Sequence, residues 1–223
     1  EYLFELKQAY DGYMFYLEQV QKCDLEAEKT LKEYGNKSNK NYQDNYPVKP
    51  IRHNKPNIED LHNILLKIQG ANPTVLPGIN DYSYLRLTAE LGNDLSKWPT
   101  KKQYTSWLGL APGQNQSGKQ SKRSKRRSST RAGQIFKQAA QSLLISKQPG
   151  LGAFARRIKA KRGAAIAIKA TARKLAELYY DIFTKGMVYV EQGVIKYEEK
   201  IRQQQINFLA RKANEYNLKL IEF

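Results

Sequence analysis

Residues 58–91 read IEDLHNILLKIQGANPTVLPGINDYSYLRLTAEL, and this stretch decides the class of fold. Apolar side chains from Ile58 to Ile68 recur at intervals of three and four, which is the spacing of one face of an α-helix. Gly70 ends that pattern, and the turn residues 73–79 lead into a second helical pattern from Asp81 to Leu91. The sequence therefore predicts two helices joined by a tight hairpin.

The hairpin contains Leu-Pro-Gly-Ile, and with its two flanking helices it has the pattern of a helix-hairpin-helix. Such a hairpin offers backbone N–H groups and a helix N-terminus to a DNA phosphate without reading base sequence. On this interpretation Pro77, Gly78 and Ile79 bind nucleic acid. A purely structural corner between two helices explains the same residues equally well.

The later parts of the chain also have helical patterns. Thr100 is suited to cap a short helix that carries Tyr104 and Trp107, and Gly109 closes it. Further apolar stripes run from Ile135 to Leu144, through Phe154 and Ile158 up to Gly163, from Ile166 to Ile182, and along a last helix from about Val188 to Asn214. We interpret these stripes as core contacts and not as cofactor sites. Strand patterns are scarce, so the predicted fold is predominantly all-α.

Residues 1–34 carry a heptad repeat. The positions of its seam step by three and four and are Leu3, Leu6, Tyr10, Tyr13, Leu17, Val20, Asp24, Ala27, Leu31 and Tyr34. Asp24 interrupts this apolar seam, where it would either fix the register or mark the end of the seam. The repeat predicts a coiled coil through which the chain forms a homo-oligomer. An antiparallel helix packed within one chain explains the repeat as well.

Composition divides the chain into four parts. Residues 1–34 are the predicted coiled-coil helix, and residues 35–57, rich in Asn, Lys, Tyr and Pro without periodicity, are a predicted flexible linker. Residues 58–184 form a helical domain with the hairpin and a basic loop, and residues 185–223 form a C-terminal helical extension. The chain starts within a helical pattern and without Met, so we expect it to be a fragment that lacks an N-terminal domain.

The positive charge of the chain is concentrated in one region. The formal net charge is +17, and the span from Leu95 to Ala176 contains 20 Lys and Arg but no Asp or Glu. Such a block predicts a polyanionic partner, because each phosphate neutralised by a cation releases condensed counterions. A membrane surface is a weaker candidate, because the basic run lacks bulky apolar residues between its cations.

Within this span, residues 109–118 read GLAPGQNQSG and lead into a basic run. The candidate nucleic-acid-binding residues there are Lys119, Lys122, Arg123, Lys125, Arg126, Arg127 and Arg131. Ser117 is the candidate nucleophile, because the glycine beside it lets the backbone approach a phosphate closely. The neighbouring Ser121, Ser124, Ser128 and Ser129 are chemically equivalent. The run can also be interpreted as a solvated segment that binds any nucleic acid.

The chemistry open to a serine here is restricted. A serine hydroxyl needs a base, a metal or nearby positive charge to act as a nucleophile. Both histidines, His53 and His62, lie upstream without a metal-ligand pattern around them, so we expect no metal site in this chain. Arginine and lysine remain, and they can stabilise the charge of a pentacovalent phosphorane. The single cysteine, Cys23, permits no internal disulfide and suggests a reducing compartment.

Six short blocks give the chain a recognisable order. They are LPGI at 76–79, AELG at 89–92, WLGLAP at 107–112, QSG at 116–118, QAA at 138–140 and ARKL at 172–175. The blocks resemble the C-terminal transposase domain of insertion-sequence family 110, which is grouped with 116 and 902. The resemblance covers about residues 58–184, and the helix at 1–34 is similar to the coiled coil of the same proteins. Asn80, Trp107 and the pair Ser128-Ser129 depart from the family pattern.

The resemblance implies a DNA transposase or recombinase with two catalytic parts. One is an N-terminal RuvC-like domain whose acidic residues hold Mg²⁺, and we expect that domain to be absent from this chain. The other is this domain, whose serine forms a covalent bond to DNA, and Ser117 is the position that carries over. The resemblance also implies a structured bridge RNA as a partner and a location in the prokaryotic cytosol or nucleoid. The alternative is a non-catalytic helical nucleic-acid-binding module.

Overall fold

A computed structural model of the chain describes residues 1–38, 40, 42, 46–51, 55–112 and 129–218, together with the backbone of 115–117 and 120–122. Of five residues in the last helix only the backbone is described, namely Glu191, Gln192, Val194, Glu198 and Ile201. The regular secondary structure of the described residues is almost entirely helical, which confirms the prediction of a predominantly all-α fold. No helix within these residues is long and apolar enough to cross a membrane.

The chain forms two compact units. The first unit contains Glu1–Val75 and Ile79–Asn93, and the second contains Leu76–Gly78 and Asp94–Phe223. The elements of the first unit are α1 (Tyr2–Lys37), α2 (Leu61–Gln69), the 3₁₀ turn η1 (Pro73–Val75) and α3 (Asp81–Leu91). The elements of the second are α4 (Lys101–Trp107), β1 (Asn115–Ser117), β2 (Gln120–Lys122), α5 (Arg131–Leu143), α6 (Leu151–Arg162), α7 (Ala164–Lys185) and α8 (Met187–Glu215).

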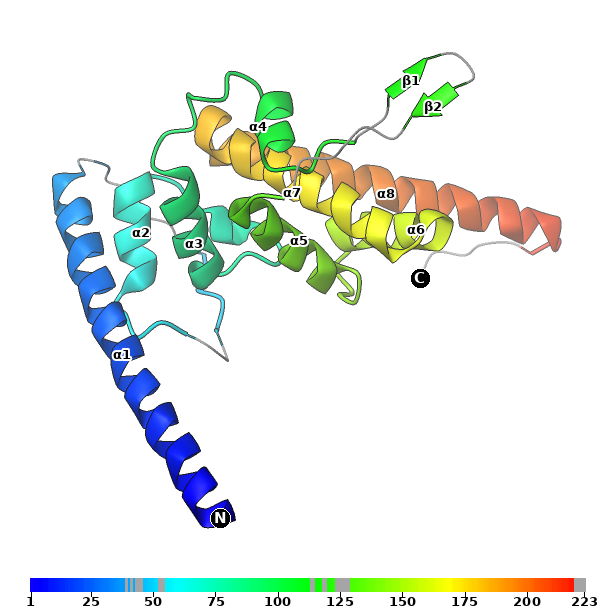
Figure 1. Cartoon of the computed structure of the whole chain (residues 1–223). Coiled ribbons are helices and arrows are strands. Elements are labelled where there is room, and N and C mark those ends of the chain that lie inside the picture. The colour runs from blue at the N-terminus through cyan, green and yellow to red at the C-terminus, as the bar shows by residue number, and fades with distance from the viewer. Residues whose placement is uncertain are drawn as a thin grey trace. The chain divides into compact units, whose positions relative to one another are not determined.

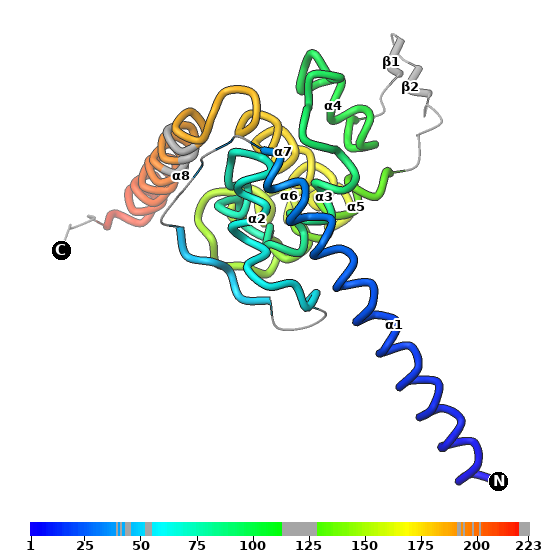
Figure 2. The backbone as a smooth tube through the Cα atoms, turned by 90° about the vertical axis from the view of Figure 1, so that its left-hand side faces the viewer, coloured from blue at the N-terminus to red at the C-terminus, as the bar shows by residue number. Residues whose placement is uncertain are grey.

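In the first unit, α2 packs against the C-terminal part of α1, and the N-terminal turns of α1 extend beyond it (Figures 1 and 2). Gly35 of α1 is buried, and a Cβ there would contact the Ile64 side chain of α2. The apolar seam residues on the N-terminal side of Asp24, from Leu3 to Val20, are exposed. Where α1 packs against α2, the seam residues Ala27 and Leu31 are half-buried, whereas Tyr34 is exposed. No described residue covers the first turns of the predicted seam.

Asp24 lies where the uncovered and packed parts of α1 meet. Its carboxylate oxygen Oδ2 accepts a hydrogen bond from the backbone N–H of Asn57, with 2.9 Å between the two atoms. The chain that follows the predicted linker is thus tied to α1 at this point. A carboxylate that accepts an N–H bond explains how a polar residue can occupy an otherwise apolar stripe.

The two helices of the predicted hairpin are present, with α3 starting at Asp81 as expected. Gly70 ends α2 in the left-handed conformation that glycine adopts without strain. The buried Tyr84 hydroxyl then ties α3 to α2, donating to the carbonyl oxygens of Ala71 at 2.8 Å and Leu65 at 3.3 Å. Ile58, predicted to start the first helix, precedes α2 but is buried with it.

In the second unit, α7 is the central helix and packs against α4, α5, α6 and α8 (Figure 1). Phe136 of α5 and Tyr179 of α7 stack edge to face with ring centroids 5.6 Å apart. Asp181 of α7 is buried and forms ion pairs with Lys101 of α4 at 3.0 Å and Lys185 at 3.1 Å. These contacts fix α4 and α5 on α7, and α4 and α5 carry the two ends of the basic loop.

Candidate nucleic-acid site

The candidate serine lies on a short β-hairpin that the sequence did not predict. Strands β1 and β2 are antiparallel, and their register pairs Asn115 with Lys122, Gln116 with Ser121 and Ser117 with Gln120 (Figure 1). Ser117 is thus the last residue of β1. An antiparallel pair holds its backbone in extended form, which fixes the course of the chain on both sides of Ser117.

Most of the predicted basic contacts fall outside the described residues. This applies to Lys119, Arg123, Lys125, Arg126, Arg127, Ser124 and Ser128, and to the side chains of Ser117, Ser121 and Lys122. Arg131 is described and is exposed as the first residue of α5. The predicted roles of these residues remain predictions.

The helix before the basic loop is set by its local sequence. Thr100 and Gln103 form a reciprocal capping box at the start of α4, in which the side chain of each accepts from the backbone N–H of the other. Gly109 has a φ of 71° just after the helix, as expected for a glycine that closes it. The Leu110 N–H then donates to the carbonyl of Thr105 at 3.0 Å, which turns the chain away from α4.

The two ends of the basic loop meet at the carbonyl group of Leu108. The Ser129 hydroxyl donates to this carbonyl oxygen at 3.3 Å. Thr130 caps α5 by accepting from the N–H of Gly133 at 3.1 Å. A Cβ at Gly133 would collide with the same Leu108 oxygen and lie 2.6 Å from Ser129 Oγ. The glycine therefore allows α5 to start directly against the end of α4.

The loop anchor contains residues whose role the sequence analysis missed. Ser129 was considered only as an alternative nucleophile, and Gly133 was not considered. A signal was available, since Ser129-Thr130 precede a helix and Gly133 occupies the third helical position, where glycine is unfavourable without a packing reason.

The three hairpin residues predicted to bind nucleic acid, Pro77, Gly78 and Ile79, have different environments. Gly78 is exposed and has a φ of 81°, and a Cβ there would lie 2.9 Å from the carbonyl oxygen of Ala139 in α5. Pro77 is half-buried, whereas the Ile79 side chain is buried and contributes to the core. Because its side chain is buried, Ile79 could contact nucleic acid only through its backbone groups.

Two side chains with acceptor oxygens, Asn80 and Asp81, lie at the start of α3, where the hairpin would otherwise offer its N–H groups to a phosphate. Asn80 caps the helix by accepting from the Ser83 N–H at 2.9 Å. Asp81 follows in the first turn, and its Oδ1 lies 2.7 Å from Nδ1 of His62. His62 is thus part of a nearly buried pair with a carboxylate, a contact that its sequence surroundings did not indicate.

Lys49, from the predicted linker, contacts this hairpin. Its ammonium group donates to the carbonyl oxygens of Thr74 and Ile79, the latter at 3.2 Å. Burial lowers the pKa of Lys49, and the nearby Asp81 opposes that shift. In the sequence, one of these carbonyl groups precedes Leu76-Pro77-Gly78 and the other follows it. The Lys49 ammonium group therefore holds both carbonyl groups together.

The described residues do not offer a metal site. They contain no group of three or more His, Cys, Asp or Glu side chains that could hold a metal ion. The carboxylate Asp181 is engaged by two lysines, and Glu177 pairs with Arg173 at 2.9 Å.

Comparison with known proteins gives one match. Residues 74–156 match the model of the transposase family IS116/IS110/IS902. No curated protein and no solved structure matches the chain. The matched span starts at η1, includes the β1–β2 hairpin and the loop anchor, and ends in α6. The match supports a transposase role and, with it, DNA as a partner.

Proposed function

We propose that this chain is the serine-bearing part of a DNA transposase and that Ser117 attacks a DNA phosphodiester. The observation that carries the proposal is the position of Ser117 at the end of β1, within the span that matches the transposase family. Ser117 also lies within the acid-free basic region from Leu95 to Ala176. A serine there is surrounded in sequence by cations and not by carboxylates that would repel a phosphate.

The proposed step is a phosphoryl transfer. The Ser117 Oγ–phosphorus bond forms while one phosphorus–oxygen ester bond of the DNA breaks, and the proton lost by the hydroxyl is balanced by one taken up by the leaving sugar oxygen. Phosphoryl transfer depends mainly on positioning and on neutralising charge on the equatorial oxygens. Lys119, Arg123, Arg126 and Arg127 supply that charge in the proposal.

Further partners belong to the same proposal. Carboxylates of a RuvC-like domain outside this chain would hold Mg²⁺, and a structured bridge RNA would select the DNA, in the prokaryotic cytosol or nucleoid. The exposed seam of α1 would pair protomers, since an uncovered apolar stripe favours burial against a second copy. The backbone of Pro77, Gly78 and Ile79 would contact duplex phosphates.

The experiment that tests the proposal is capture of the covalent intermediate. The complete enzyme is incubated with end-labelled DNA and then denatured. The protein and the DNA are digested, and the peptide that carries a nucleotide is identified by mass spectrometry. A nucleotide on the peptide with Ser117 is the expected result. DNA that is bound and retained without any covalent adduct would favour the non-catalytic nucleic-acid-binding module instead.

A further inference from the structure

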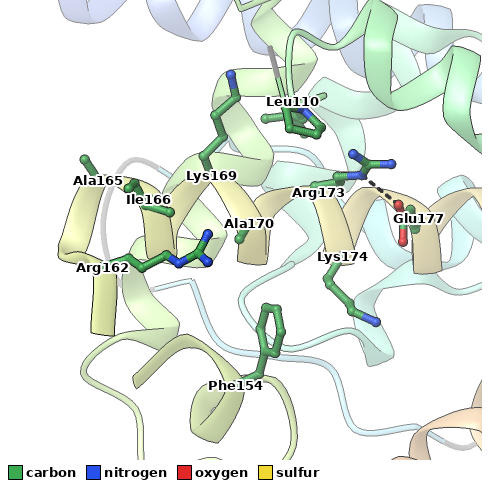
Figure 3. A pocket seen from close by; sticks show the side chains of 11 residues that line it. Leu110, Phe154, Arg162, Ala165, Ile166, Lys169, Ala170, Arg173, Lys174 and Glu177 are labelled. Carbon is green, nitrogen blue, oxygen red and sulfur yellow. Dashed lines mark hydrogen bonds and ion pairs between the residues drawn. The ribbon is translucent and has the colours of Figure 1, made fainter. Parts of the chain in front are cut away.

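A groove with a volume of about 580 Å³ runs over one face of α7. Figure 3 shows Ala170 between Leu110 on one side of the helix and Phe154 on the other. Pro112 and Ile166 also line the groove. The short side chain of Ala170 leaves the helix surface open between the two walls. The volume is within the range of ligand sites, about 300–1,000 Å³.

The helical spacing of Phe154 and Ile166 predicts core positions, and the structure corrects this prediction. Ile166 is 51% exposed and Phe154 is half-buried, and both line the groove. Helical spacing identifies the faces of α6 and α7 but cannot say which face is covered, because that depends on packing between helices. No residue that the structure describes covers their apolar surface.

Positive charge surrounds this apolar surface. The cationic residues that line the groove are Arg162, Lys169, Arg173 and Lys174, and Glu177 is the one acidic residue among the lining residues described. The Nε of Arg173 donates to Glu177 at 2.9 Å, which holds the guanidinium group in place (Figure 3). The ammonium group of Lys174 lies 5.9 Å from the centre of the Phe154 ring. Cations thus lie directly beside the aromatic wall.

This combination discriminates between kinds of polyanion. A double helix presents phosphates outside and keeps its base faces stacked inside, so it would contact the cations and leave Phe154 and Ile166 uncovered. An unpaired strand offers phosphates and base faces together, and aromatic side chains beside cations are the surfaces on which such strands stack. We infer that the groove over α7 binds an unpaired stretch of polynucleotide, with phosphates on its cations and bases on Phe154 and Ile166.

The inference rests on the proposed function for the identity of the polyanion, and it adds a place for the strand. Pro112 precedes Ser117 by five residues, so the chain limits their Cα separation to about 18 Å. A strand held in the groove is therefore within reach of the serine hairpin. The groove would position unpaired nucleotides beside the bond that Ser117 attacks.

The test compares two pairs of cation deletions in the complete chain. Arg162→Ala with Lys174→Ala removes two cations from the groove, and Lys102→Ala with Lys147→Ala removes two exposed cations outside it. Fluorescence anisotropy measures the binding of labelled oligothymidine, oligouridine and a duplex, each of about twelve nucleotides, which is within the site sizes of single-strand binders. The expected result is about a tenfold greater loss of single-strand binding for the groove variant than for the control. Duplex binding should fall equally in both.

A second measurement does not depend on the variants folding. Oligonucleotides with a photoreactive thiolated base are crosslinked to the unmodified chain, and the peptide containing Phe154 is the expected product. Equal losses in both variants for all three probes, or crosslinks that avoid α6 and α7, would overturn the inference. The stronger of the oligothymidine and oligouridine responses identifies the strand as DNA or RNA.

These outcomes are separable from those of the proposed function. Oligonucleotide binding needs no strand cleavage, so it can be measured on Ser117→Ala as well as on the unmodified chain. A groove effect without any serine adduct would contradict the proposed chemistry and leave the binding site standing. An adduct with no groove effect would do the reverse.

Discussion

The Ser129 hydroxyl donates a hydrogen bond to the carbonyl oxygen of Leu108 across 3.3 Å. This contact joins the residue at the end of α4 to the residue before the cap of α5, so the loop that carries Ser117 leaves the helical scaffold and returns to it at one place. A loop with joined ends is positioned by its scaffold, which leaves the sequence between the ends available for binding.

The close contact at this anchor predicts a large effect of Gly133→Ala. The new Cβ would collide with the Leu108 carbonyl oxygen, and backbone atoms on both sides restrict its relief. We expect the free energy of unfolding to fall by about 1–3 kcal/mol, even though alanine is the better helix former. Urea unfolding measures it. Gly193→Ala in α8 is the matched control, because nothing lies within 4 Å of its Cβ position; a similar loss there would contradict the explanation.

Ser117→Ala should abolish recombination by the complete enzyme while leaving its fold and DNA affinity nearly unchanged. Loss of one loop hydroxyl should change the unfolding free energy by no more than about 0.5 kcal/mol. Loss of a covalent nucleophile removes the chemical step itself. Recombination assays on Ser121→Ala, Ser124→Ala and Ser128→Ala provide controls with the same loop charge. Near wild-type recombination by Ser117→Ala would assign the attack to another group or to water.

Binding of duplex DNA should weaken steeply with salt. If the basic loop contacts on the order of five phosphates, log K should fall against log salt with a slope of about −4.5. Replacing Arg123, Arg126 and Arg127 by Ala should reduce that slope by about three contacts. Titrations at several salt concentrations give the slope directly. A slope that the triple variant leaves unchanged would show that the loop does not contact the backbone of DNA.

The helices were predictable from sequence because their signals are local. The caps Asn80, Thr100 and Thr130 and the closing glycines Gly70 and Gly109 act within one turn of the helix they limit. Apolar spacing then identified α2 to α8 with boundaries near those observed. Such signals depend only on residues close in sequence, so they can be recognised without knowing which helices pack together.

The Lys49 contact and the groove were not predictable because each depends on distant residues. Lys49 meets carbonyl groups 25 and 30 positions away, and nothing near Lys49 indicates them. The β1–β2 hairpin forms in a polar sequence without the alternation of a typical strand, so its pairing is invisible to a periodicity argument. The heptad of α1 was correctly assigned to a helix, but only packing shows that Asp24 divides it.

Residues 1–34 should drive self-association through the exposed part of the seam. Tyr13→Lys with Leu17→Lys places two charges on it and should shift the chain toward monomer in analytical ultracentrifugation. Gln8→Lys with Gln19→Lys adds the same charge away from the seam and should leave the association intact. If the unmodified chain is already monomeric at about 10–100 μM, the seam does not pair protomers.

Two buried tyrosines predict a loss of stability at alkaline pH. Burial raises the pKa of Tyr104, with Tyr179 adding to the shift, and burial also raises the pKa of Tyr179. Above about pH 10 the unfolded chain loses these protons and the folded chain keeps them, so stability falls by about 1.4 kcal/mol per pH unit for each tyrosine. Urea unfolding between about pH 9 and pH 11 measures the slope.

Tyr104→Phe isolates one of these two groups. The Tyr104 hydroxyl has no hydrogen-bond partner among the described residues, so its removal should be neutral or stabilising at neutral pH. The variant should show about half of the alkaline slope that the buried pair contributes. A slope identical to that of the unmodified chain would mean that Tyr104 titrates equally in the folded and unfolded states.

The uncovered arm of α1, from Tyr2 to Val20, has a consequence for the amount of protein that a cell must hold. A helix of this length is marginal in water unless its apolar side is covered. In the proposed dimer, helix formation in the arm and pairing of the arms therefore become one event, which depends on the concentration of the chain. At a low concentration of the chain most arms would stay unpaired, and at a higher concentration they would pair. Under this proposal, an activity that needs paired arms would rise with the abundance of the chain.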